Sequence, residues 1–156
     1  DIASALRSFK GIKRRFSYQI KNEKLVYIDD YAHHPTEINA VHQAVRELYP
    51  DKKVLAIFQP HLFSRTKDFA DDFAKSLAAF DEVILLDIYP ARELPMEGIT
   101  SSWLLDKIEN YSKKLAAKQE LIPTILKSNA TVIVTIGVGD IGEMVTSIKK
   151  ALNETI

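Results

Sequence analysis

The chain has 156 residues, which is enough for one domain with a normal hydrophobic core. Its 21 basic and 21 acidic residues balance, so charge gives no reason to expect nucleic acid or a membrane surface as a partner. The absence of cysteine excludes disulfide scaffolds, thiolate metal sites and cysteine nucleophiles. No apolar run approaches the roughly 20 residues of a membrane span, and no signal-peptide pattern opens the chain. We therefore expect a soluble, cytoplasmic protein.

The first residues indicate that the sequence is part of something longer. Residues 1–9 carry apolar side chains at helical spacing, and Gly11 is typical of a helix end. The chain also starts without a methionine. We expect either that the protein is processed or that residues 1–156 form one domain of a larger chain.

A β-hairpin is predicted next. Residues 16–20 and 24–30 both have strand character and flank a turn at Asn22 and Glu23. A short basic run, residues 13–15, leads into the hairpin, and its simplest interpretation is a solvated strand entry.

From Pro35 the apolar spacing changes from 2 to 3.6, which predicts a helix that begins at Pro35 and ends near Pro50. Three continuous apolar runs, residues 53–58, 82–88 and 131–136, are typical of strands buried on both faces of a parallel sheet.

Further helices should alternate with these strands. They are a helix with Phe69, Phe73 and Leu77, a helix capped by Thr100 or Ser101 that reaches Tyr111, a helix over residues 115–127 that Pro123 should kink or split, and a final helix that opens with Asp140 and Glu143 as a variant capping box. This alternation predicts a doubly wound α/β fold with a mostly parallel sheet and an N-terminal antiparallel hairpin.

Polar residues follow four of the predicted strands, at residues 31–37, 59–66, 89–93 and 137–140. The carboxyl ends of parallel strands meet at one edge of a sheet, and open α/β sheets bind ligands in the crevice there. Three of the four histidines, two candidate arginines and a glycine-rich turn are therefore expected around one site.

The glycine-rich turn has the pattern G-x-G-x-x-G at Gly137, Gly139 and Gly142, between a predicted strand and a helix. Only 14 residues follow Gly142, so no second strand can complete a dinucleotide-binding unit. The pattern favours a tight strand-to-helix turn, with backbone amides available to an anion.

His33 and His34 could suggest a metal site, but neighbouring side chains on an extended segment point to opposite sides. The ligand spacing of a catalytic zinc is also missing, so we expect no metal site. A histidine at a helix N-terminus can donate to a carboxylate or phosphate oxygen. Capping of the helix is an equally good role for His34 and a less good one for His33.

Arg65 lies at the head of a predicted helix, where its charge does not favour the helix dipole. An anionic ligand explains it better, because the planar guanidinium matches carboxylate and phosphate. A surface salt bridge with Asp68 is the alternative.

Three segments together identify a family. Residues 11–16, 29–38 and 58–66 resemble the C-terminal domain of the ATP-dependent Mur ligases of bacterial peptidoglycan synthesis, and residues 87–93 and 137–142 fit in the same order. The segment 58–66 is similar to that of the members that join L-alanine to UDP-N-acetylmuramate. The ligase that recycles murein tripeptide shares the histidine segment but differs in 58–66.

The resemblance implies a Rossmann-like domain of a three-domain enzyme. ATP phosphorylates the muramic-acid carboxylate, and the amine of L-alanine attacks the acyl phosphate. ATP and Mg²⁺ are held mainly by the absent central domain, while the C-terminal domain binds the amino acid and closes over ATP. The domain alone should catalyse nothing. The alternatives are the tripeptide-recycling ligase and a noncatalytic nucleotide- or anion-binding regulatory module.

The resemblance also implies roles for individual residues, but no catalytic residue and no metal ligand in this domain alone. Residues expected to face the nucleotide are Asp30, Arg15 and, as a candidate, Arg14; residues expected to bind L-alanine are Tyr31, His33, Arg65 and, as a candidate, Arg92. Two departures from the family pattern matter: Leu62 stands where arginine is common, and Arg92 where glycine is common, whereas Ala32 in place of glycine is minor. Arg92 could restore the charge missing at Leu62, or could simply pair with Glu93 or solvent.

Overall fold

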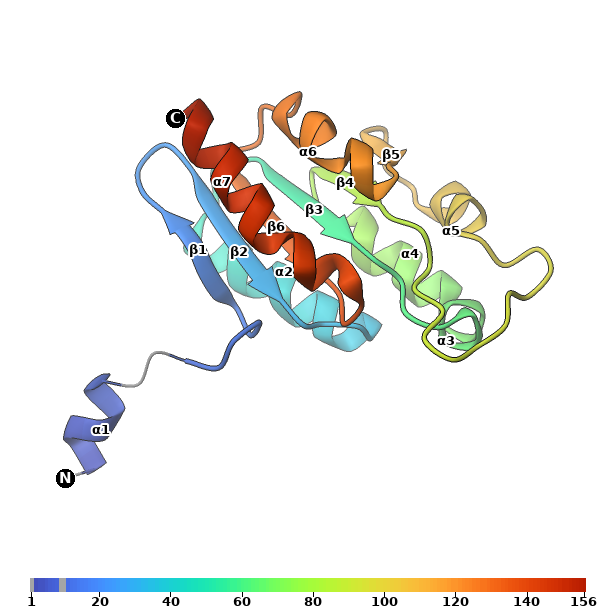
Figure 1. Cartoon of the computed structure of the whole chain (residues 1–156), viewed down its shortest axis with the longest axis horizontal. Coiled ribbons are helices and arrows are strands. Elements are labelled where there is room, and N and C mark those ends of the chain that lie inside the picture. The colour runs from blue at the N-terminus through green and yellow to red at the C-terminus, as the bar shows by residue number, and fades with distance from the viewer. Residues whose placement is uncertain (1, 9–10) are drawn as a thin grey trace.

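The computed structural model describes residues 2–8 and 11–156. Its sheet has six strands in the order β1-β2-β6-β3-β4-β5 (Figure 1). The strands are β1 (Ser17–Lys21), β2 (Val26–Asp30), β3 (Val54–Phe58), β4 (Glu82–Leu85), β5 (Lys113–Leu115) and β6 (Val132–Ile136). β1 pairs with β2 antiparallel, and every other pair is parallel.

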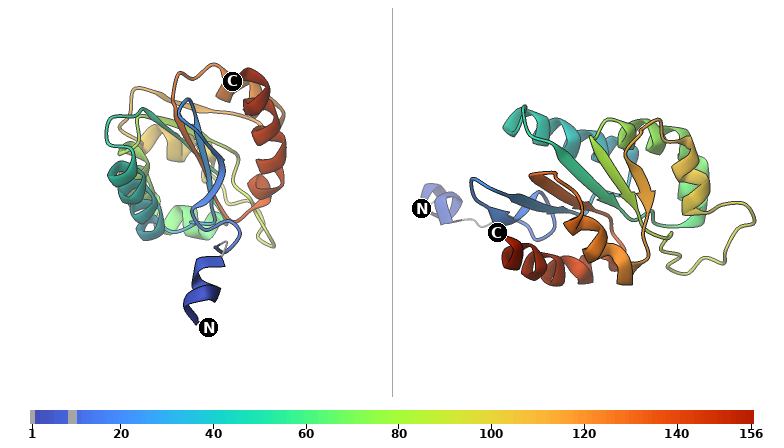
Figure 2. Two further views of the ribbon diagram at one scale, coloured as in Figure 1. Left: turned by 90° about the vertical axis from the view of Figure 1, so that its left-hand side faces the viewer. Right: turned by 90° about the horizontal axis from the view of Figure 1, so that it is seen from above.

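Helices cover both faces of the sheet (Figure 2). The helical segments are α1 (Ile2–Ser8), α2 (Pro35–Leu48), α3 (Phe63–Asp68), α4 (Ala70–Ala78), α5 (Ser101–Lys107), α6 (Lys118–Leu126), the 3₁₀ turn η1 (Asp140–Met144) and α7 (Val145–Thr155). Successive strand residues point to opposite faces, so Ile28 and Ala56 pack with α2, α4 and α5, whereas Tyr27 and Ile57 pack with α6 and α7. Both cores are apolar, and β3 and β6 are buried along their whole length. None of the described helices is long and apolar enough to cross a membrane.

The predicted α/β architecture and hairpin are thus confirmed. The predicted helix over residues 1–9 corresponds to α1, although Asp1 and Phe9 lie outside the described residues.

The region after α5 differs from the prediction. α5 ends at Lys107 rather than at Tyr111, which is fully exposed, and Leu115 belongs to β5 instead of a helix. The reason is Lys113, whose Nζ donates to the carbonyls of Leu105 (2.9 Å) and Ile108 (2.6 Å) and so satisfies the C-terminal end of α5. The chain is then free to add β5 to the edge of β4.

Other element ends were also predicted incorrectly. The single helix expected around Phe69 is two, because the backbone breaks there between α3 and α4. Pro123 lies inside α6 without splitting it, since burial of Leu121 and Ile125 offsets the roughly 3 kcal/mol that an interior proline costs. No capping box opens the final helix, because Asp140 lies in η1 and bonds to Gln59 instead.

Candidate active-site edge of the sheet

The structure brings the four polar segments together at the carboxyl edge of the sheet. The amide of Gly137 donates to the carbonyl of Asp30 (3.1 Å), which joins the segments after β6 and β2. The amide of Gln59 donates to Ile136 (3.1 Å), and His61 forms a parallel bridge with Tyr89. Backbone bonds therefore hold this edge as one surface before any ligand is considered.

A cavity of about 340 Å³ opens at this edge, between the end of β2 and the first turns of α2. Its lining residues are Arg15, Phe16, Asp30, Tyr31, Ala32, Glu37, Ala40, Val41 and Ala44. Two side chains expected at the nucleotide, Arg15 and Asp30, thus share one cavity with Tyr31. In the part of the chain that the structure describes, no group of three or more histidine, cysteine, aspartate or glutamate residues is placed to hold a metal ion.

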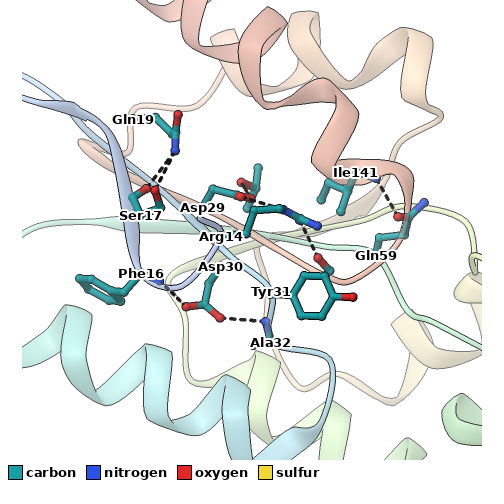
Figure 3. Close-up of polar contacts among 12 residues, drawn as sticks. Arg14, Phe16, Ser17, Gln19, Asp29, Asp30, Tyr31, Ala32, Gln59 and Ile141 are labelled. Carbon is teal, nitrogen blue, oxygen red and sulfur yellow. Dashed lines mark hydrogen bonds and ion pairs between the residues drawn. The ribbon is translucent and has the colours of Figure 1, made fainter. Parts of the chain in front are cut away.

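Asp30 lines this cavity and is held there by two backbone amides. Its carboxylate accepts hydrogen bonds from the amides of Phe16 (2.7 Å) and Ala32 (2.8 Å), as Figure 3 shows. Burial raises the pKa of Asp30 above its usual value, although the two amide bonds act in the opposite direction. Each carboxylate oxygen keeps a lone pair for a further donor, such as a hydroxyl of a ligand.

Arg14 behaves differently from its neighbour Arg15, which is exposed. Its Nε lies 2.9 Å from Asp29 Oδ2, and its Nη2 donates to the carbonyl of Gly137 at 2.6 Å. Asp29 is only 1% exposed and also accepts from the hydroxyl of Thr135 (2.8 Å), which in turn meets the hydroxyl of Tyr27 (3.1 Å). Burial raises the pKa of Tyr27, so this phenol stays protonated within the network.

The two adjacent histidines have distinct roles. His34 is the N-cap of α2: its Nδ1 accepts from the amide of Thr36 (3.3 Å), its own amide donates to Glu37 Oε2 (3.0 Å), and its ring packs on Phe69 at 4.7 Å. Burial would raise the pKa of Glu37, but the amides of His33 and His34 outweigh it and lower that pKa. The capping alternative therefore holds for His34.

His33 is turned toward Tyr31 instead. Its Nδ1 lies 3.0 Å from the Tyr31 carbonyl and 3.5 Å from Glu37, and the two rings meet edge to face at 5.7 Å. The two residues expected at the amino acid, Tyr31 and His33, are therefore in contact with each other.

Arg65 is half-buried and lies beside His61, with 3.1 Å between Nη1 and the histidine Nδ1. The His61 ring stacks on Tyr89 with 5.8 Å between centroids. Burial, and then the charge of Arg65, lowers the pKa of His61, so a neutral histidine accepts from the guanidinium. Within residues 2–8 and 11–156 the salt bridge considered with Asp68 is not formed, which leaves the charge of Arg65 without a carboxylate partner.

Glu93 is a residue whose role the sequence did not reveal. Its carboxylate accepts from both the amide (3.0 Å) and the hydroxyl of Ser64, and these bonds lower its pKa. It thereby fixes the first turn of α3, which carries Arg65. Arg92 is exposed and makes no ion pair with Glu93 or any other described residue.

Gln59 and two glycines hold the turn after β6 against the end of β3. Gln59 donates from Nε2 to Asp140 (2.6 Å) and accepts at Oε1 from the amide of Ile141 (2.9 Å). A Cβ on Gly139 would lie 2.5 Å from Gln59 Oε1, and one on Gly142 would lie 2.7 Å from the Arg14 guanidinium. Close packing explains these glycines without a dinucleotide. The signal for Gln59 was its place directly after a buried strand, where it is only 3% exposed.

Known proteins are similar to this chain in sequence and in fold. Residues 14–139 match the family model described as Mur ligase, glutamate ligase domain. A UDP-N-acetylmuramate–L-alanine ligase of Flavobacterium psychrophilum is 78% identical over 99% of this chain and 34% of its own length. The ligase of the same name from Porphyromonas gingivalis is 49% identical over 97% of the chain and 34% of its own length.

Solved structures agree. A UDP-N-acetylmuramate–alanine ligase of Thermotoga maritima superposes with a TM-score of 0.74 at 28% identity and covers 98% of this chain and 33% of its own. A murein peptide ligase of Psychrobacter arcticus shares the fold, with a TM-score of 0.71 at 23% identity over 98% of this chain and 32% of its own. The chain spans about a third of the length of the curated relatives it matches. With most of its residues inside the matched model, the chain belongs to the Mur ligase, glutamate ligase domain family.

Proposed function

We propose that this chain is the C-terminal domain of an ATP-dependent ligase that joins L-alanine to UDP-N-acetylmuramate in peptidoglycan synthesis. The observation that carries the proposal is 78% identity, over 99% of the chain, to a protein named for that activity. The parent enzyme would work in the cytoplasm, and its N-terminal and central domains would supply the uridine-nucleotide site and most of the ATP and Mg²⁺ site.

The geometry supports a division of this edge into two parts. Asp30 and Arg15 share the cavity between β2 and α2, which suits a polar part of a nucleotide such as a ribose and its phosphates. Tyr31, His33 and Arg65 would surround L-alanine. Arg65 is the candidate carboxylate clamp, because its charge is partly buried and has no carboxylate partner among the described residues.

A carboxylate clamp suits the proposed reaction. The amine of L-alanine must reach the acyl phosphate as a free nucleophile, so the protein should hold the amino acid by its other end. Neutral His61 adds no charge that would attract the carboxylate away from Arg65. Charge developing on the phosphoryl oxygens would need fixed cationic donors, and we propose that Arg15, which is exposed, supplies one.

The proposal is tested on the full-length protein that contains this chain. Purified protein with Mg²⁺, ATP, UDP-N-acetylmuramate and L-alanine should release ADP and phosphate, and omission of either acceptor substrate should abolish release. Stronger activity with the murein tripeptide than with L-alanine would assign the protein to the recycling ligases. Nucleotide binding without any ADP release would favour a noncatalytic regulatory module.

The isolated domain provides a control. It should fold cooperatively but release no ADP, because phosphoryl transfer requires the metal and lysine-bearing phosphate loop that the other domains would supply. Turnover by the purified domain, with contaminating enzymes excluded, would contradict the division of labour proposed here.

A further inference from the structure

The side chain of Arg14 contacts several segments of the chain at this edge of the sheet. Its side chain lies between Asp29 and the ring of Tyr31 (Figure 3), with 5.3 Å from Cζ to the ring centroid. Its Nε pairs with Asp29 at 2.9 Å, and its Nη2 holds the carbonyl of Gly137 at 2.6 Å. One guanidinium thus contacts the end of β2, the turn after β6, and a residue expected at the amino acid.

The third nitrogen of this guanidinium, Nη1, lies close to the backbone of Gly142. A Cβ at Gly142 would lie 2.7 Å from both Cζ and Nη1 of Arg14, a distance that real Cβ atoms do not tolerate. The backbone of η1 therefore packs directly on the guanidinium, and a side chain at position 142 would force the guanidinium to move.

The backbone of Arg14 is also held in an unusual state. Its φ of 60° lies in the left-handed region, which is unfavourable for a residue with a side chain. Its carbonyl accepts from the amide of Tyr31 at 2.6 Å, so the same residue fixes Tyr31 by main chain and by side chain. Such strained conformations persist only when surrounding contacts determine them.

We propose that Arg14 is a positioning residue, which sets Tyr31 and the glycine turn 137–142 in place for amino-acid binding and does not contact the nucleotide. The proposal rests on the proposed function of the parent enzyme. On this proposal Arg14 and Arg15 have different roles, because the exposed side chain of Arg15 lines the cavity with Asp30.

A role for Arg14 as a ligand for phosphate is disfavoured by Asp29. That carboxylate is 1% exposed, and among the described residues its other side-chain donor is the hydroxyl of Thr135. If the guanidinium swung toward a ligand, it would leave a buried, uncompensated charge, which is among the most destabilising changes a fold can suffer. Arg14 is therefore committed to the protein.

The first test compares KM for L-alanine with KM for ATP in variants of the full-length enzyme. Arg14→Lys retains a charge for Asp29 but cannot also hold Gly137, so KM for L-alanine should rise about 10- to 100-fold through misplaced Tyr31. KM for ATP should stay at the wild-type value, whereas Arg15→Ala should raise it. If Arg14→Lys and Arg15→Ala both raise KM for ATP and spare L-alanine, Arg14 is a nucleotide ligand and the proposal fails.

A matched control distinguishes positioning from general destabilisation. Arg46→Lys weakens another ion pair, with Asp81 at 2.6 Å, at the opposite end of the sheet. At equal loss of melting temperature, the Arg46 variant should leave KM for L-alanine unchanged. An equal rise of KM in both variants would show that Arg14 matters only for stability.

The second test needs no activity, so it stands even if the proposed function fails. Gly142→Ala should lower the melting temperature of the wild-type protein, because the new Cβ collides with the guanidinium. In an Arg14→Gln background the same change should lower it far less. If Arg14→Gln does not fold, the double variant Arg14→Gln, Asp29→Asn serves as the background, since it removes the guanidinium and the buried charge that depends on it together. Additive shifts would overturn the proposed contact.

Discussion

Arg65 is the side chain on which L-alanine binding should depend most. In the full-length enzyme, Arg65→Ala should raise KM for L-alanine by roughly 10- to 150-fold, the equivalent of a charge-assisted hydrogen bond worth about 1.5–3 kcal/mol. Arg65→Lys should restore only part of the loss, because lysine lacks the planar fork. Steady-state kinetics with L-alanine as the varied substrate measures both.

Lys67 is the control for Arg65, because it lies on the same helix but is exposed. Lys67→Ala should leave KM for L-alanine and KM for ATP unchanged. If Arg65→Ala leaves alanine kinetics intact and only lowers the melting temperature, Arg65 is structural.

The paired histidines should separate into a binding and a stabilising residue. His34→Ala removes the N-cap of α2 and should lower the free energy of unfolding by about 1 kcal/mol with little effect on substrate binding. His33→Ala should weaken L-alanine binding, because His33 touches Tyr31. Urea unfolding and kinetics of both variants measure this, and the reverse pattern would show that the two roles are exchanged.

Arg92 remains a candidate substitute for the arginine missing at Leu62. The structure leaves it exposed and without an ion-pair partner in the described chain, since Glu93 bonds to Ser64. If Arg92 reaches the amino acid, Arg92→Gly should impair L-alanine use and Leu62→Arg should restore it. A double-mutant cycle should then show coupling above the roughly 0.5 kcal/mol of independent sites. Additive effects would end this idea.

At the scale of elements, Lys113 joins β5 to α5. Its Nζ satisfies the carbonyls of Leu105 and Ile108, so Lys113→Met should lower the free energy of unfolding by about 1–2 kcal/mol while it keeps the apolar stem. Lys114→Met on the same strand is the control, because Lys114 is exposed and should change stability little. Equal unfolding midpoints in urea for the two variants would contradict this account.

Asp81 joins α2 to β3, since its Oδ2 accepts from Arg46 (2.6 Å) and from the amide of Val54 (2.7 Å). Burial would raise the pKa of Asp81, but these two bonds outweigh it and lower that pKa. A carboxyl whose pKa falls on folding stabilises the protein above its unfolded pKa of about 3.9, and that contribution is lost as pH falls through the folded value.

Asp81→Asn should therefore destabilise the protein by about 0.5–1.5 kcal/mol at pH 7, a modest figure because the pair is partly exposed. The difference from wild type should shrink between pH 4 and pH 2, as Asp81 of the wild type becomes protonated. Urea unfolding at several pH values measures this, with exposed Asp106→Asn as control. A difference that stays constant down to pH 2 would exclude the ionised carboxylate as its source.

How far the sequence could predict each element depended on the kind of signal. β3 and β6 were predictable because fully buried strands are continuous apolar runs. β5 was not, because three residues that include Lys113 and Lys114 carry no apolar alternation. The convergence of polar segments at one edge followed from parallel topology alone, since strand ends share an edge whatever their loops do.

The internal contacts of the site could not be predicted in the same way. Arg14 meets Asp29 and Gly137 across sequence separations of 15 and 123 residues, which no local pattern encodes. Glu93 binds Ser64 rather than its neighbour Arg92 because the turn at Pro90 carries it to α3. Which polar residues serve a ligand and which serve the fold is decided by such long-range contacts.

At the scale of the whole molecule, the strand order places the last strand in the middle. β6 pairs with β2 on one side and β3 on the other, so residues 26–30 and 54–58 have no direct pairing with each other. The two parts of the sheet, the β1–β2 hairpin and the β3–β4 pair, are hydrogen-bonded into one sheet when residues 132–136 enter between them.

This order has a consequence for biosynthesis. A ribosome delivers β2 and β3 long before β6, so the growing chain carries two unpaired strand edges, and the side chains of β3 are all apolar. Pairing between distant segments is slow, and exposed edges are sites of aggregation while it is incomplete. The nascent domain should therefore depend on chaperones until its central strand has been translated, and premature termination before Val132 should yield an insoluble product rather than a smaller folded one.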